Sequence, residues 1–195
     1  MNIFIPYCHD KITLQDIEKS IESLDDKRLI KQILETKQIY NCYLKYKNST
    51  DRSKGYINHP IVQHYIKYPE FLSVYGEYCC EEYYYRFNKH HIYELFFKTE
   101  KNKWEEYYET YHLLSIRNVI PFYIEKSKKD PTNIRTTKHV DILFQQKLKN
   151  KWYSDILEKN RIPKWTKREI PSFFIQIKNI TNISNKTPQN SQMKF

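Results

Sequence analysis

Residues 23–40 read SLDDKRLIKQILETKQIY and place one carboxylate, Glu35, beside two basic side chains. At about 100° per residue, an α-helix brings Arg28 and Glu35 onto one azimuth, with Lys31 slightly further round. Glu35 would then lie at the rim of the apolar face, where nearby positive charge keeps a carboxylate ionised and able to act as a base. The same pattern also fits an ordinary surface glutamate that pairs with Lys31, which is common on amphipathic helices.

Polar side chains also gather just before two expected helix starts. The stretch KGYINHP, residues 54–60, presents Tyr56, Asn58 and His59 ahead of a helix that begins at its proline, and TTKHVDILFQQKL presents His139 in the same way. The free amides of a helix N-terminus are a natural contact for phosphate. Alternatively, Asn58 or His59 simply caps the helix.

Several other chemistries lack their signatures. The chain has no GxxxxGK[ST], GxSxG or HExxH motif, which removes the sequence support for NTPase, serine hydrolase and zincin activities. The four cysteines include no C-x-x-C pair, so we expect neither a metal site nor a cofactor. Only two glycines occur, which argues against a glycine-rich nucleotide-binding loop.

The charge balance favours a polyanion as partner. Lys and Arg number 33 against 23 Asp and Glu, for a formal net charge of +10. Nucleic acid is the first candidate, although basic residues spread along the chain also fit a merely soluble basic surface. No apolar run approaches a membrane span or a secretory signal, so we expect an intracellular protein that is neither secreted nor membrane-bound.

The elements that must position these residues are helices, since no convincing period-2 run occurs. An extended N-terminal arm precedes them, and Thr13 is a good N-cap for the first helix. We expect helices at 14–24, 25–46, from Pro60, at 69–87, one or two within 90–130, and two short ones within 136–159. Residues 178–195 have too few apolar side chains for a core and are expected to be disordered, which leaves one domain over 1–177.

Several of these stretches, taken in order, resemble a known family. They are IFIPY, LDDKRLIKQILETKQI, GYINHP, YPEFLSVYGEYCCEEYYYRF and KHVDILFQQKLKNKWYSDIL. Together they are similar to the pyrimidine-dimer DNA glycosylase (endonuclease V) family, and more closely to its uncharacterised bacterial and viral branch. The resemblance covers most of 1–90 and resumes near 131–160, so 90–130 looks like an insertion. It implies an all-α, compact single-domain helical bundle with an extended N-terminal arm.

The resemblance also implies a mechanism. In phage-type members the nucleophile is the N-terminal α-amine, which here belongs to Met1, or to Asn2 if the methionine is removed. Alignment of the Arg28-Leu29 pair places the supporting carboxylate at Glu35, and His59 falls where the family has a histidine near the active site. An α-amine has a pKa near 8, so a useful fraction of it is neutral and nucleophilic. Reaching the sugar requires a kinked duplex and a flipped nucleotide.

These observations predict a monomeric DNA repair glycosylase that acts on damaged pyrimidines, such as pyrimidine dimers, in double-stranded DNA and has AP-lyase activity. The alternative is a non-catalytic nucleic-acid-binding protein that retains the fold, and a weaker third reading is a protein-interaction domain that uses the Tyr-rich helices. The expected catalytic residues are Glu35, Met1 and Asn2, and the expected DNA contacts are Arg28, Lys31, Tyr56, Asn58, His59 and His139.

Overall fold

The structure is a computed structural model that describes residues 2–8, 12–48, 56–104 and 140–177. Its elements are α1 (Leu14–Glu22), α2 (Asp26–Asn48), the 3₁₀ turn η1 (Tyr56–Asn58), α3 (Pro60–Tyr65), α4 (Pro69–Phe87), α5 (Glu94–Asn102), α8 (Val140–Lys159) and the 3₁₀ turn η2 (Ser172–Ile177). Within these ranges there is no β-strand, which confirms the predicted all-α fold. No helix of the described ranges is both long and apolar enough to cross a membrane.

Local chemistry sets most helix boundaries where the sequence predicts them. Thr13 accepts a hydrogen bond from the backbone N–H of Asp16, whose carboxylate in turn accepts one from the N–H of Thr13, so α1 begins with a capping box. Pro60 and Pro69 occupy the first turns of α3 and α4, where a missing N–H costs nothing. Asn88 ends α4 in the left-handed conformation, with φ of 52°.

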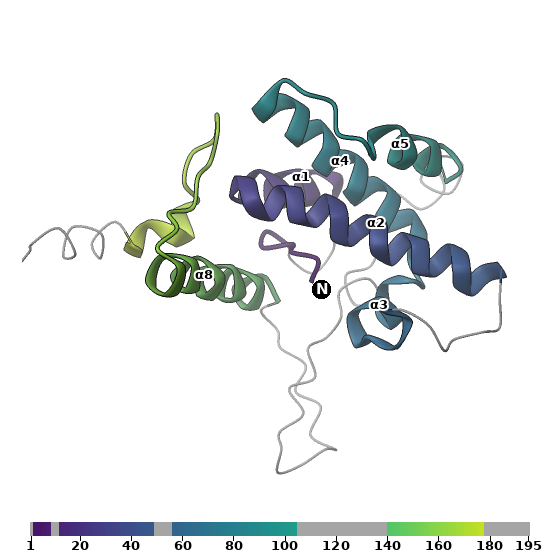
Figure 1. Cartoon of the computed structure of the whole chain (residues 1–195), viewed down its shortest axis with the longest axis horizontal. Helices are drawn as coiled ribbons and strands as arrows, with labels where there is room; N and C mark the ends of the chain where they lie inside the picture. Colours follow the sequence, from purple (N-terminus) through teal and green to yellow (C-terminus); the bar gives the residue numbers. More distant parts are fainter. Residues whose placement is uncertain (1, 9–11, 49–55, 105–139, 178–195) are drawn as a thin grey trace, which may run out of the picture.

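The core forms where α2 and α4 pack together, with α1 and α5 against α4 (Figure 1). Leu29, Ile33 and Tyr40 of α2 are buried there, as the predicted apolar stripe requires. The N-terminal arm, residues 2–8, packs on this core through Ile3, Phe4 and Ile5, each at most 3% exposed. The expected arm is therefore present as a buried structural element.

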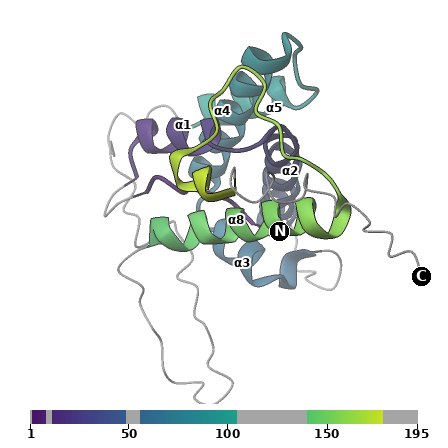
Figure 2. The ribbon, with the colours of Figure 1, turned by 90° about the vertical axis from the view of Figure 1, so that its left-hand side faces the viewer.

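Residues 140–159 form one continuous helix, so the prediction of two short helices in this region was wrong. No glycine or proline interrupts the stretch, and its Lys and Asn residues do not break a helix. Phe144, Leu148 and Trp152 bury one face of α8 against the rest of the domain. Figure 2 shows α8 lying across this side of the bundle, with the N-terminal arm behind it.

The segment after α8 runs back over the start of α2. The backbone N–H of Asp26 donates to the carbonyl of Lys164 at 2.8 Å, and the indole N–H of Trp165 donates to the carbonyl of Ser23 at 3.0 Å. These contacts attach the C-terminal part of the described chain to the N-terminal end of α2. They therefore hold α8 beside the same end of that helix.

Some sequence predictions fall on residues that the structure does not describe. They are the disordered tail at 178–195, His139, Met1 and the larger part of the proposed insertion at 90–130. Within that insertion, α5 occupies residues 94–102. The division of the chain into a domain over 1–177 and a tail stays a prediction.

Candidate active site

Glu35 lies on α2 at the edge of the core, only 8% exposed. Its Oε2 accepts a hydrogen bond from the backbone N–H of Asn2 at 3.1 Å and lies 3.4 Å from the side-chain amide nitrogen of Gln32. The ammonium of Lys31 is 3.7 Å from the other carboxylate oxygen. The carboxylate thus lies between the backbone nitrogen of the N-terminal arm and one basic side chain.

Gln32 holds the arm in place one helical turn before Glu35. Its amide nitrogen donates to the carbonyl of Asn2 at 2.8 Å, and its amide oxygen accepts from the N–H of Phe4 at 3.1 Å. The fully buried Tyr75 hydroxyl lies 2.9 Å from that amide oxygen and 3.0 Å from the carbonyl of Phe4. Buried polar groups satisfied in this way allow little movement, so the nitrogen of Asn2 is fixed at Glu35.

The carboxylate faces a pocket of about 350 Å³ between the arm, α2 and α8. Five basic side chains and two carboxylates line it, so its charge is positive overall. The lining residues are Asn2 and Phe4 of the arm, Lys27, Arg28, Lys31, Gln32 and Glu35 of α2, and Asn150, Lys151, Ser154, Asp155 and Lys159 of α8.

A buried ion pair joins the two helices at this pocket. One guanidinium nitrogen of Arg28 donates to Asp155 of α8 and to Asp25, and the other donates to the backbone carbonyl of Lys151 at 3.1 Å. Trp152 adds an indole hydrogen bond to Asp25 at 2.7 Å. Burial alone would raise the pKa of Asp155, but the hydrogen bond and charge of Arg28 outweigh it and hold that pKa at about 2.

Lys151 is the half-buried lysine of the α8 side. Burial lowers the pKa of its ammonium, and the positive charges of Lys31 and Arg28 lower it further, while Glu35 acts in the opposite direction. A lysine whose charged form is destabilised in this way carries a larger neutral, nucleophilic fraction. The pocket therefore contains an amine and a carboxylate whose charges act on each other.

One comparison with known proteins gives a match over the N-terminal segment that contains Glu35. Residues 1–95 match the family model of pyrimidine dimer DNA glycosylase. This match supports the predicted family over residues 1–95. No curated protein and no solved structure gives a significant match to the chain. The glycosylase match contains the arm, α1 to α4 and the carboxylate of Glu35, and it ends before α8.

The structure brings only some of the predicted DNA contacts to the pocket at Glu35. Lys31 lines the pocket with an exposed side chain. Arg28 lies at the pocket wall, where its guanidinium donates hydrogen bonds to Asp155 and to the carbonyl of Lys151. The three residues of the KGYINHP motif, Tyr56, Asn58 and His59, do not line it. Their roles in DNA binding stay predictions.

His59 has a structural partner in this fold. Its Nδ1 accepts a hydrogen bond from the backbone N–H of Ile61 at 3.2 Å, so it caps α3, which was the alternative interpretation of the motif. Tyr56 and Asn58 are exposed nearby. Figure 1 shows α3 packed towards the C-terminal end of α2, whereas α8 lies beside its N-terminal half. The motif and the pocket are thus at different ends of one helix.

Sequence reasoning missed the contribution of α8 to the pocket. Lys151, Asp155 and Lys159 follow one another at intervals of four residues, which puts them on one helix face. That spacing was available as a signal, but it is shared by many solvent-exposed helices. Only the packing of Trp152 and the pairing of Asp155 with Arg28 turn this face towards Glu35.

Proposed function

We propose that this protein is a DNA repair glycosylase that removes damaged pyrimidines from duplex DNA and has AP-lyase activity. The observation that carries the proposal is the buried carboxylate of Glu35, 3.1 Å from the backbone nitrogen of Asn2 in a basic pocket. This arrangement lies inside the segment that matches the pyrimidine dimer DNA glycosylase family.

The amine in this mechanism is the N-terminal one. After removal of Met1, the nitrogen that contacts Glu35 is itself the α-amine. If Met1 is retained, the amine lies one residue further along the arm. With a pKa near 8, a neutral α-amine is available at physiological pH, and a carboxylate beside it accepts protons as they leave the nitrogen.

The proposed reaction begins at C1′ of the damaged nucleotide. The lone pair of the amine forms a bond to C1′ as the glycosidic bond breaks, and the base leaves with that electron pair and takes up a proton. The positive charge that develops on the sugar lies next to the ionised Glu35, which stabilises it. The nitrogen then loses a proton, and its lone pair forms a C=N bond as the C1′–O4′ bond breaks and O4′ takes up a proton. The product is a protonated imine between the protein and the ring-opened sugar.

Strand cleavage follows from that imine. The imine makes the C2′ hydrogen acidic, Glu35 accepts this proton, and the C3′–O bond breaks so that the phosphate leaves with the electron pair. Hydrolysis of the imine releases the sugar and restores the amine.

The pocket suits such a substrate in size and charge. A volume of about 350 Å³ falls in the range of small-molecule sites, about 300–1,000 Å³, and the surrounding lysines attract phosphates. The amine can reach C1′ only when the nucleotide leaves the base stack and enters the pocket. The free-energy cost of this flipping is lowest for a damaged base.

The test is base excision from a duplex with a single cyclobutane dimer, followed under single-turnover conditions. Glu35→Gln keeps the size of the side chain but removes the base, so we expect excision to slow by about 10²–10⁴-fold. Glu18→Gln, the same change at an exposed position of α1, is the matched control and should excise at the wild-type rate. The intact mass of the purified protein establishes which residue carries the α-amine.

Two results would contradict this proposal. Equal excision rates in Glu35→Gln and wild type would remove Glu35 from the mechanism. Salt-sensitive DNA binding without excision or cleavage would instead identify a non-catalytic nucleic-acid-binding protein with the same fold.

A further inference from the structure

The five basic residues that line the pocket differ in their partners. Asp155 pairs with Lys27, Arg28 and Lys159, and Glu35 pairs with Lys31. Among the described residues, only the ammonium of Lys151 is left in this pocket without an ion pair or hydrogen bond. An unpaired ammonium is costly when half-buried, unless it serves a ligand or loses its proton.

The position of Lys151 is fixed by the fold rather than by its own side chain. Its backbone carbonyl accepts a hydrogen bond from Arg28, and the next residue, Trp152, is fully buried and bonded to Asp25. The side chain therefore starts from a fixed point on the pocket wall. A catalytic group must be supported by a rigid element in this way to keep its place in the site.

We propose that Lys151 is a second amine of this active site, one that forms a covalent imine with C1′ of an abasic deoxyribose in DNA. The inference rests on the proposed function for its substrate and for Glu35 as the base. It does not depend on which residue carries the N-terminal α-amine, since Lys151 is an internal residue of α8.

The chemistry balances without any co-reactant. The ammonium of Lys151 first loses a proton, and the lone pair of the neutral amine attacks the aldehyde carbon of the ring-opened abasic sugar. The carbonyl oxygen takes up the two protons that the nitrogen loses and leaves as water as the C=N bond forms. Glu35 then accepts the C2′ proton, and the C3′–O bond breaks with release of the 3′ phosphate. The cationic neighbours that lower the pKa of Lys151 also favour its neutral form before attack.

The experiment starts from a duplex with a preformed abasic site, so it requires no glycosylase activity. Borohydride reduces any imine to a stable amine, and proteolysis with peptide mass spectrometry locates the adduct. We expect an adduct on the peptide that contains Lys151. Both Lys151→Ala and Lys151→Arg should lose this adduct, since a guanidinium does not form the imine.

The Arg variant separates a nucleophile from a phosphate contact, because it keeps the positive charge. Lys149→Ala is the control on the same helix, because Lys149 is half-buried there and does not line the pocket. It should trap DNA as the wild type does. Far-UV circular dichroism and a thermal midpoint near that of the wild type show that each variant is folded.

Three results would overturn the inference: an adduct found only on residue 1 or 2, an adduct that still forms on the α8 peptide of Lys151→Arg at the wild-type yield, or no adduct under conditions that trap a known AP lyase. Failure here is distinguishable from failure of the proposed function. Dimer excision without a Lys151 adduct would contradict only the role of Lys151 as a second amine. A Lys151 adduct without dimer excision would contradict the proposed glycosylase step and support the role of Lys151.

Discussion

The pocket has two walls that are attached to the core by different means. The first wall, formed by the N-terminal arm and α2, is held by the amide of Gln32 and by the buried side chains of Ile3, Phe4 and Ile5. The second wall, formed by α8, is held by Trp152 and by the pairing of Arg28 with Asp155. Neutral hydrogen bonds and apolar packing position one wall, and charges position much of the other.

This difference has a consequence for function. The first wall carries Glu35 and lies within the family match, whereas the second carries Lys151 and lies outside it. Carboxylate and amine thus come from separate parts of the chain, and they share a pocket only while α8 stays on α2. Conditions that loosen the second wall should therefore affect the proposed reaction before the helical core unfolds.

The largest expected effect comes from removing the anchor of the second wall. Trp152→Ala deletes a fully buried indole and leaves one carboxylate oxygen of Asp25, Oδ1, without its donor, so we expect a loss of about 3–5 kcal/mol in the free energy of unfolding. Urea unfolding followed by circular dichroism measures it. Leu157→Ala, at a position 69% exposed on the same helix, is the control and should change stability by less than about 0.5 kcal/mol. Similar stability for the two variants would mean that α8 does not depend on Trp152.

A smaller effect is expected when acid neutralises the link between the walls. The folded-state pKa of Asp155 is about 2, below its ordinary value of 3.8, so its contribution is complete above about pH 5 and is lost as the pH falls towards 2. The shift corresponds to about 2 kcal/mol. Burial raises the pKa of Asp25, so protonation of that group on acidification acts in the opposite direction and offsets part of the loss.

Asp155→Asn isolates the contribution of the Asp155 charge to the free energy of unfolding, because the variant has no carboxylate to titrate at that position. Urea midpoints of wild type and variant should differ clearly at pH 7, differ less at pH 3 and converge as the pH approaches 2. A difference that stays constant between these two pH values would show that the charge of Asp155 does not stabilise the second wall.

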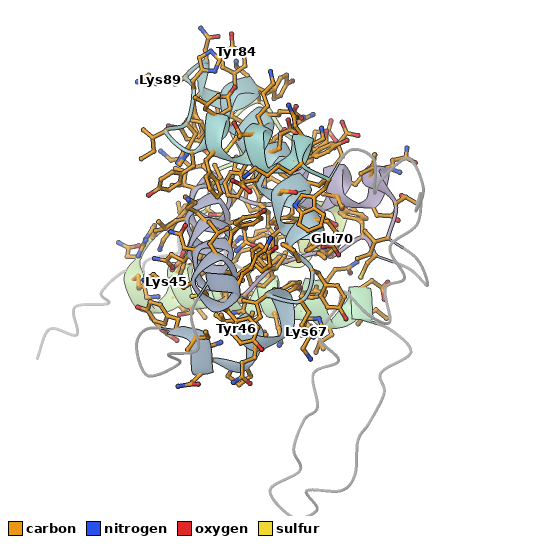
Figure 3. The ribbon with its side chains drawn as sticks, turned by 90° about the vertical axis from the view of Figure 1, so that its right-hand side faces the viewer. Lys45, Tyr46, Lys67, Glu70, Tyr84 and Lys89 are labelled. Atoms are coloured by element: carbon orange, nitrogen blue, oxygen red, sulfur yellow. The ribbon has the colours of Figure 1, made fainter. Side chains whose placement is uncertain are left out.

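The smallest effect should come from an exposed charge at the rim of the first wall. Lys31→Ala removes one potential phosphate contact, so we expect duplex DNA affinity to fall by less than about tenfold and the salt slope to decrease by about 1. Lys45→Ala is the matched control, an exposed lysine towards the other end of α2 that Figure 3 shows on the face near α3. Fluorescence anisotropy at several salt concentrations measures both. Equal losses in the two variants would place DNA along the whole of α2 rather than at the pocket.

Several features of the fold could be predicted because they depend on nearby residues. Thr13 with Asp16 starts α1, prolines start α3 and α4, and the apolar spacing of α2 identifies its buried face. The same spacing placed Glu35 at the rim of that face, where the structure finds it. Local hydrogen bonds and helical periodicity act over a few residues, so the sequence displays them directly.

Contacts between distant residues could not be predicted in this way. Gln32 looks like any polar helix residue until the backbone of the arm meets it, and Arg28 looks like a DNA contact until Asp155, far along the chain, pairs with it. His59 could equally have capped α3 or faced a ligand, and the geometry of α3 shows that it caps.

By itself, the sequence determined an all-α domain, a basic surface and a carboxylate at the edge of the long helix α2, since these follow from composition and period. Only the tertiary structure decided what this carboxylate faces. In the folded protein the backbone nitrogen of Asn2 donates a hydrogen bond to Glu35, and Lys151 of α8 lines the same pocket. The physical reason is that buried hydrogen bonds and ion pairs form between groups whose distance in the sequence says nothing about their distance in space.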